Sequence, residues 1–330
     1  MQTSREVIKA AIEFTVPDRL PVMFGALGHN DVHGVSRNSP GKAAPAPYSH
    51  YDEWGCGWLK TELENMGQIK IHPISEWAKL DGYIFPDPDD PVCYEGVENQ
   101  FIGSEDKYII TGIFMLLFEK LQALRGFENL LEDFYSEWGK ISDLADRVVD
   151  FNLRVIDNMA SRFPGKIDGL SFTDDWGTET ALIINPKLWD EFFKPRYKKI
   201  FDACHGVGWH VWMHSCGKVN EILEGLIEIG CDVINLQQPR VMGIKEVGEK
   251  FAGKICFQTT CDIQHTMPFE DADYIREEAK LLMDCWGTER GGFILSDYGS
   301  DAAIGTTREK TEAMYEAFMK YDRWKSKLDK

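Results

Sequence analysis

The chain of 330 residues lacks long apolar runs, and acidic residues outnumber basic ones. No stretch approaches the roughly 20 apolar residues that a membrane-spanning helix needs. The first residues, MQTSREVIKAAIEF, are charged and amphipathic and lack the apolar core of a secretion signal. We therefore expect a cytoplasmic protein with no membrane partner. The net charge of −18 repels nucleic-acid phosphates, so small molecules and other proteins are the expected partners.

The eight cysteines include no CxxC pair. In a cytoplasmic protein of this size, we expect them to stay reduced and mostly to pack in the interior. The chain also lacks low-complexity tracts and obvious repeats. Its Pro- and Gly-containing segments at 37–49 and 85–91 are expected to be loops within one domain spanning 1–330. A cysteine is therefore assigned as a metal ligand only where its surroundings support that role.

Strand and helix patterns alternate through the second half of the chain. We expect strands at 168–174, 209–215, 232–238, 254–260 and 291–297. We expect helices at 185–206, 219–230, 244–251, 269–287 and from about residue 307. Asn185 suits the N-cap of the first helix, and Pro195 should kink it. These consecutive βα units predict a parallel sheet covered by helices.

The first half is less regular. Its candidate strands lie at 19–26, at 108–114 and at either 69–74 or 81–85. With about eight strands in total, the best prediction is an α/β fold, a (β/α)8 TIM barrel with an N-terminal helical extension. A doubly wound open sheet is the alternative, but the Gly-rich phosphate loop that usually follows its first strand is missing.

The segment VWMHSCGK, residues 211–218, ends an expected strand with a histidine and a cysteine. Because side chains alternate along a strand, His214 and Cys216 share one face, and Gly217 lets the backbone turn tightly after them. Imidazole nitrogen and thiolate sulfur are preferred ligands of zinc. The segment indicates a metal site. The alternative is that His214 caps a backbone group and Cys216 packs in the core.

Polar side chains also end the neighbouring strands, where barrel enzymes place their chemistry. Asp174 and Asp175, beside Trp176, could orient a substrate or act as acid or base, or could instead form a turn or helix cap. Gln237 and Gln238 offer neutral amides for hydrogen bonds to a polar substrate. We expect these side chains to face one mouth of the barrel.

Other strand ends supply further candidates. His29 lies in a polar segment after the first strand, and Cys261 lies just past the strand at 254–260. Asp297 and Tyr298 follow the last strand. The alternative for each is a place in a polar loop.

The run from 174 to 239, DDWGTETALIINPKLWDEFFKPRYKKIFDACHGVGWHVWMHSCGKVNEILEGLIEIGCDVINLQQP, resembles the uroporphyrinogen decarboxylase superfamily. The likeness continues through KICFQTTCDIQHTMPFEDADYIREEAKLLMDCWG and GGFILSDYGSDAAIG, and spans about residues 15 to 320. It is greatest to the branch of cobamide-dependent methyltransferases. The resemblance implies a (β/α)8 barrel, in agreement with the strand pattern.

The two chemistries of this superfamily differ after the first strand. The decarboxylases that the chain resembles need no metal and carry arginines there that grip the carboxylates of their substrate. Here the segment reads VMFGALGHNDVHG, with no Arg or Lys between Leu20 and Val35. A pocket without those cations matches a polycarboxylate poorly. The methyltransferase branch is therefore favoured.

In that branch, zinc is held by an HxCG motif and by a later cysteine near the last strand. His214, Cys216 and Gly217 match the first part of the pattern. The later position reads FILSDYGSD and has no cysteine. The resemblance thus implies zinc at His214 and Cys216, and the expected third ligand is Cys261 or Asp297.

The resemblance also implies a reaction. Zinc acts as a Lewis acid on an acceptor thiol or on the ether oxygen of a methoxylated aromatic, and a methyl group moves to the cobalamin of a corrinoid protein. Because the chain lacks the DxHxxG corrinoid signature, we expect the corrinoid on a separate partner. Asp175 and Tyr298 are the expected catalytic residues, with Tyr298 as proton donor. Substrate binding is assigned to His29, Asp174, Trp176, Gln237 and Gln238.

Two other functions stay open at this point. One is a decarboxylase-like lyase acting on a smaller carboxylic acid. The other is a non-catalytic barrel that binds a ligand or a corrinoid protein. A homodimer is compatible with each of them.

Overall fold

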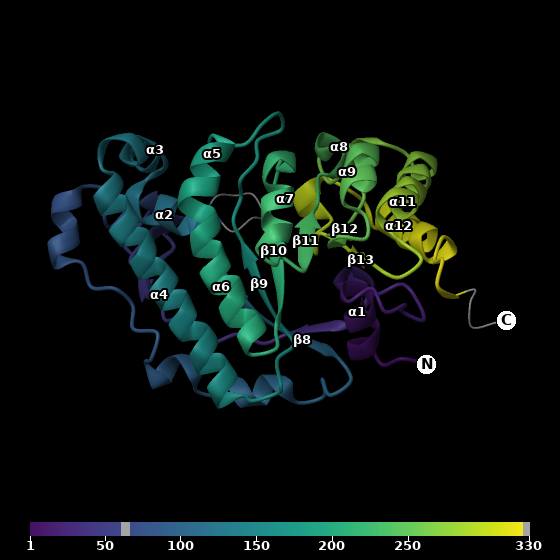
Figure 1. Ribbon diagram of the computed structural model, residues 1–330, viewed down its shortest axis with the longest axis horizontal. Helices are drawn as coiled ribbons and strands as arrows, with labels where there is room; N and C mark the ends of the chain where they lie inside the picture. The colour runs from purple at the N-terminus through teal and green to yellow at the C-terminus, as the bar shows by residue number, and fades with distance from the viewer. Residues whose placement is uncertain (61–66, 326–330) are drawn as a thin grey trace.

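The computed structural model describes residues 1–60 and 67–325, and its main sheet is a nearly closed barrel (Figure 1). Its strand order is β2-β1-β13-β12-β11-β10-β9-β8-β3, and only β1 and β2 pair antiparallel. Asp31 alone separates β2 from β3 in the chain, so the two ends of the sheet meet. The strands are β1 (Val22–Phe24), β2 (His29–Asn30), β3 (Val32–Gly34), β8 (Tyr108–Ile113), β9 (Gly169–Thr173), β10 (His210–His214), β11 (Val233–Leu236), β12 (Cys256–Thr259) and β13 (Phe293–Ser296). The predicted α/β barrel is confirmed.

Helices surround the barrel and follow its strands in the second half of the chain, as predicted (Figure 1). The longer helices are α1 (Ser4–Ile12), α2 (Phe118–Arg125), α3 (Phe127–Ser136), α4 (Trp138–Arg162), α6 (Lys194–Gly206), α7 (Asn220–Glu228), α9 (Ile244–Phe251), α11 (Ala272–Trp286) and α12 (Arg308–Lys320). The short ones are α5 (Pro186–Leu188), α8 (Pro239–Met242) and α10 (Thr266–Phe269). In the described part of the chain, we find no helix that combines the length and the apolarity needed to cross a bilayer.

The helix expected at 185–206 is interrupted. Asn185 caps its start by accepting a hydrogen bond from the Lys187 N–H (2.9 Å). The turn Trp189–Phe193 between α5 and α6 is π-helical. Pro195 explains this, because it has no N–H to donate to the preceding turn and its ring crowds the carbonyl there.

The N-terminal helix α1 covers the amino ends of β8 and β9. Its Arg5 and Lys9 form ion pairs with Asp168 at 2.7 and 2.8 Å. Asp168 also accepts a hydrogen bond from the N–H of Ile109 in β8. Ile8 of α1 packs with side chains that fill the barrel interior, including Trp212. The interior of the barrel is therefore filled by side chains at this end.

The prediction for the region between β3 and β8 was wrong. Residues 68–71 do form a strand, but it belongs to a separate antiparallel sheet, in the order β4-β5-β6-β7. The segment 81–85 contributes no strand, because it starts in a 3₁₀ helix, Trp77–Gly82. The missing barrel strand is β3, which is three residues long and buries only Val32. The small sheet consists of β4 (Lys42–Ala43), β5 (His50–Tyr51), β6 (Gly57–Leu59) and β7 (Gln68–Ile71).

Candidate metal and substrate site

His214 and Cys216 meet at the carboxyl end of β10. The Sγ of Cys216 lies 3.3 Å from the Nε2 of His214. The turn after them requires glycine, because Gly217 has a φ of 76° and an added Cβ would lie 2.3 Å from the carbonyl group of Gly177. The sequence therefore directs an imidazole nitrogen and a thiol sulfur to one point at the barrel mouth.

Asp175 supplies a third donor atom at this point. Its Oδ1 lies 3.6 Å from the Nε2 of His214 and accepts a hydrogen bond from the N–H of Cys216 at 2.9 Å. Within the part of the chain that the structure describes, the three side chains form the one cluster of this kind, with their ligand atoms within 4.8 Å of one another. A nitrogen, a sulfur and an oxygen donor beside an open cavity form a donor set that suits a catalytic zinc ion.

The two residues expected as third ligand lie elsewhere, which corrects that expectation. Cys261 is fully buried, and its Sγ lies 3.6 Å from the carbonyl oxygen of Ile275 in α11. The Oδ2 of Asp297 accepts a hydrogen bond from the N–H of Ala26 at 2.6 Å. Neither side chain belongs to the donor cluster.

Asn235, which the sequence analysis overlooked, orients the imidazole of His214. The two residues lie opposite each other in the β10–β11 register. The Nδ2 of Asn235 donates to the carbonyl oxygen of Gln258 (3.2 Å), so its Oδ1 is the atom that faces the Nδ1 of His214 at 2.5 Å. Because Oδ1 only accepts, Nδ1 is the nitrogen that donates to it, and Nε2 is the nitrogen that points to the donor cluster. Outer hydrogen bonds of this kind fix the ligand geometry of metal-binding histidines.

The thiol of Cys216 stays protonated without a cation beside it. Burial and the neighbouring Asp175 carboxylate raise the pKa of Cys216 far above its ordinary value. Metal binding would reverse this effect, because a divalent cation stabilises a bound thiolate.

The donor cluster opens into a cavity of about 970 Å³. Gln237, Gln238 and Tyr298 line it, as the sequence predicts for substrate-binding and catalytic residues. The Oε1 of Gln238 accepts a hydrogen bond from the N–H of Gly217 at 2.6 Å, so part of this amide supports the turn. Tyr298 is 42% exposed. Their roles toward a substrate stay predictions.

Asp174 and Trp176 face the outer layer of the barrel and do not line the cavity, which corrects their assignment to substrate binding. The carboxylate of Asp174 is fully buried and accepts hydrogen bonds from the N–H groups of Leu117, Phe118 and Glu119, at 2.8 to 3.1 Å, and from the Tyr197 hydroxyl at 2.6 Å. It caps α2, which is the alternative that the sequence left open. Trp176 is buried as well, and its Nε1 donates to Tyr197.

His29 also lies away from the donor cluster. Its ring stacks on Tyr315 with 4.9 Å between the ring centroids. It lines a different cavity, together with Arg19 and Asp31. The stacking and this separate cavity argue against a role in substrate binding near His214.

Glu119 in α2 is a further cavity residue that the sequence analysis overlooked. Burial and the nearby Asp174 and Asp175 carboxylates raise the pKa of Glu119 to about 8. The hydroxyl of Thr173 accepts from the N–H of Met115 and donates to the Oε2 of Glu119 at 2.7 Å. Near neutral pH, Glu119 therefore carries a proton that it can give to a group in the cavity.

A parallel α/β barrel with a polar cavity at the carboxyl ends of its strands is the architecture in which barrel enzymes hold their active sites. Residues 109–321 match the family model described as Uroporphyrinogen decarboxylase (URO-D), and the chain belongs to this family. The predicted superfamily is thereby confirmed.

Among solved structures, the chain is similar to a methyltransferase from Methanosarcina mazei, with 15% identity over 97% of this chain and 99% of that one, and a TM-score of 0.72. It is less similar to xylanase 10B from Thermotoga petrophila, with 13% identity over 97% and 98% of the two chains and a TM-score of 0.43. At these identities, the likeness to the methyltransferase establishes a shared fold. No curated protein matches the chain.

Proposed function

We propose that the protein is a zinc-dependent methyltransferase that moves a methyl group between a small methylated donor and the cobalamin of a separate corrinoid protein. The observation that carries this proposal is the cluster of Asp175, His214 and Cys216, whose donor atoms lie within 4.8 Å of one another beside an open cavity. The likeness of the fold to a methyltransferase supports the same class of reaction.

The residues present fit a zinc ion. Asn235 accepts a hydrogen bond from Nδ1 of His214, which leaves Nε2 as the ligand atom, and Cys216 and Asp175 add a sulfur and an oxygen donor. When bound there, zinc would supply Lewis-acid polarisation of a thiol or of an ether oxygen of the substrate.

The chain's own residues would bind the donor and manage the proton. Gln237 lines the cavity, and its side-chain amide has no hydrogen-bond partner in residues 1–60 and 67–325, so it is available to a polar substrate. If an aryl methyl ether is the donor, the departing phenolate needs a proton. Protonated Glu119 would supply it, and Tyr298 is the second candidate, since both line the cavity.

The mouth of the cavity suits a large partner. Phe269, whose side chain is 79% exposed, lies at the cavity together with Pro268 and Ile304. An exposed aromatic beside apolar neighbours is a surface that a corrinoid protein could cover while its cofactor reaches the donor cluster.

The family model makes a decarboxylase-like lyase the second candidate. The lining of the cavity weighs against a polycarboxylate substrate. Its described residues include no Lys or Arg, whereas the carboxylates of Asp175 and Glu179 line it. Several carboxylates in this cavity would meet like charges and no fixed cation, so we favour a neutral donor.

The experiment combines the purified protein, zinc, a reduced corrinoid protein and a set of methoxylated aromatics. Corrinoid methylation, followed by absorption, that needs both zinc and Cys216 supports the proposal. Release of CO2 from a small acid without zinc supports the lyase. Corrinoid-protein binding without turnover in either assay indicates the non-catalytic barrel.

A further inference from the structure

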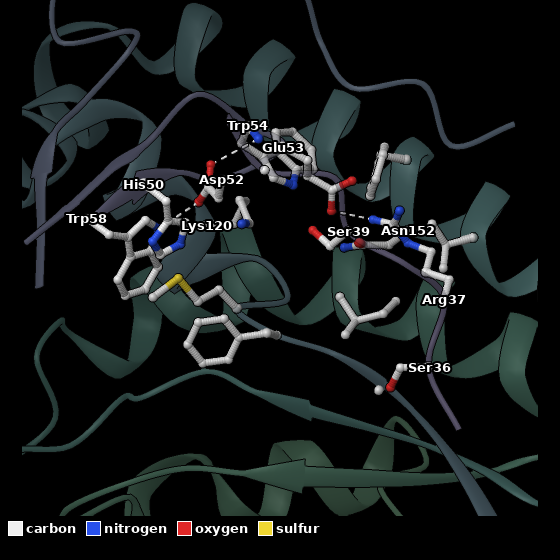
Figure 2. A pocket seen from close by; sticks show the side chains of 17 residues that line it. Ser36, Arg37, Ser39, His50, Asp52, Glu53, Trp54, Trp58, Lys120 and Asn152 are labelled. Carbon is white, nitrogen blue, oxygen red and sulfur yellow. Dashed lines mark hydrogen bonds and ion pairs between the residues drawn. The ribbon is translucent and has the colours of Figure 1, made fainter. Parts of the chain in front are cut away.

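A second cavity, of about 500 Å³, is lined by residues from the end of β8, from helix α4 and from the small antiparallel sheet (Figure 2). Phe114 lines both cavities. The two differ in charge. The second cavity contains Arg37 and Lys120, whereas the described lining of the first has no Lys or Arg.

Lys120 stands out among the buried cations. Three Lys or Arg side chains are buried in residues 1–60 and 67–325, namely Lys120, Arg125 and Arg196. Arg125 pairs with Asp133 at 2.7 Å, and Arg196 pairs with Asp146 at 2.9 Å. Lys120 is 6% exposed and has neither an ion pair nor a hydrogen bond in the described chain. Its ammonium group lies 5.1 Å from the centroid of the Trp54 ring.

The acidic groups of this cavity are already engaged. Arg37 forms a short ion pair with Glu53. Asp52 accepts hydrogen bonds from the N–H groups of Trp54 and Cys56, at 3.0 and 2.9 Å, and from the Nε1 of Trp58 at 3.1 Å. In Figure 2, dashed lines join Arg37 to Glu53 and run from Asp52 to Trp54 and Trp58, and none reaches Lys120. The side chain of Lys120 is enclosed while its ammonium group reaches the cavity, so a bound anion would give this ammonium a counter-ion.

The other walls of the cavity are aromatic. Trp54 packs edge-on against Phe151 with 4.7 Å between the ring centroids, and Trp58 lies 6.1 Å from Phe114. All four rings line the cavity. Rings of this kind bind a flat apolar body, while a single cation fixes the position of one charged end.

We propose that this cavity binds an aromatic monocarboxylate, with the carboxylate on the ammonium of Lys120 and the ring between the aromatic walls. One negative charge fits best, because Arg37 is paired with Glu53 and Lys120 is the cation of this cavity's described lining that has no ion pair. This site is separate from the donor cluster, and the proposal holds whether or not the protein transfers methyl groups.

The test uses benzoate as the probe and benzamide, which has the same ring without the charge, as the control ligand. Binding of each to the full chain is measured by calorimetry. A charge-assisted hydrogen bond predicts that benzoate binds about tenfold or more tightly than benzamide. Lys120→Met should remove this preference. The control, Lys166→Met, should keep it, because Lys166 also lies 5.1 Å from an aromatic ring, Phe101, but does not line this cavity.

Two further variants test whether benzoate binds in this cavity or at the donor cluster. Ser39→Trp, on an exposed loop at the cavity, should block benzoate and decides the matter if Lys120→Met does not fold. Cys216→Ser should leave the preference intact. The proposal is overturned if benzoate has no preference over benzamide, if the preference survives in Lys120→Met or Ser39→Trp, or if Cys216→Ser abolishes it, which would place the carboxylate at the donor cluster.

Discussion

Replacing Asn235 by leucine should weaken zinc binding although Asn235 is no ligand. The substitution keeps the side chain's size but removes the oxygen that lies 2.5 Å from the Nδ1 of His214. The imidazole can then rotate or change its tautomer, and the Nε2 lone pair is no longer held toward Cys216 and Asp175. Loss of such an outer hydrogen bond typically lowers metal affinity by about 10- to 100-fold, or about 1.4 to 2.7 kcal/mol.

The assay is competition for zinc with a chromophoric chelator at constant pH. The control is Asn158→Leu, because Asn158 and Asn235 are both 8% exposed and Asn158 bonds to Asp89, away from the site. Both variants lose buried hydrogen bonds and should lose stability. Only Asn235→Leu should lose zinc affinity. Equal zinc affinities for the parent and Asn235→Leu would refute the argument that Asn235 orients His214.

Two further predictions concern the acidic residues near the cavity. Asp174→Ala should lower the free energy of unfolding by about 3 kcal/mol or more, because it leaves three N–H groups and the Tyr197 hydroxyl without their acceptor. Asp175→Ala should change stability little and should lose zinc affinity. Chemical denaturation measures the first effect and zinc titration the second, and the opposite pattern would contradict the assignment. The pKa of Glu119 is raised from 4.5 to about 8. Between these values, the folded state holds a proton that the unfolded state releases. The stability that Glu119 contributes is therefore full below about pH 4.5 and declines as the pH rises to about 8. Glu119→Gln should therefore gain stability relative to the parent as the pH rises from 5 to 8, measured as urea midpoints, and a constant difference across this range would count against the raised pKa.

The centre of the site could be read from the sequence because strand alternation is a local rule. It places His214 and Cys216 on one face, and Gly217 marks the turn that follows. The same rule could not predict which of Asp174 and Asp175 faces the cavity, since the strand ends at Thr173. Beyond that residue, the backbone N–H groups at the start of α2 determine that the carboxylate of Asp174 is the buried one.

Residues far apart in the chain were beyond the reach of local patterns. Glu119 comes to Thr173 only because β8 and β9 pair, and Asn235 looks like one polar position inside an apolar strand until its register with His214 is known. Cys261 was misassigned because the backbone beyond β12 turns its thiol toward α11. The strand β3 was overlooked because three residues with one buried side chain give too weak a pattern.

The most direct test of the central claim is the zinc content of the purified protein and of three variants after zinc supplementation. We predict about one zinc per chain in the parent and in Cys261→Ala, and none retained by Cys216→Ala or Asp175→Ala after dialysis. Cys261→Ala is the matched control, because it removes a thiol that faces α11. A parent protein without zinc, or loss of zinc in Cys261→Ala, would contradict a zinc site built from Asp175, His214 and Cys216.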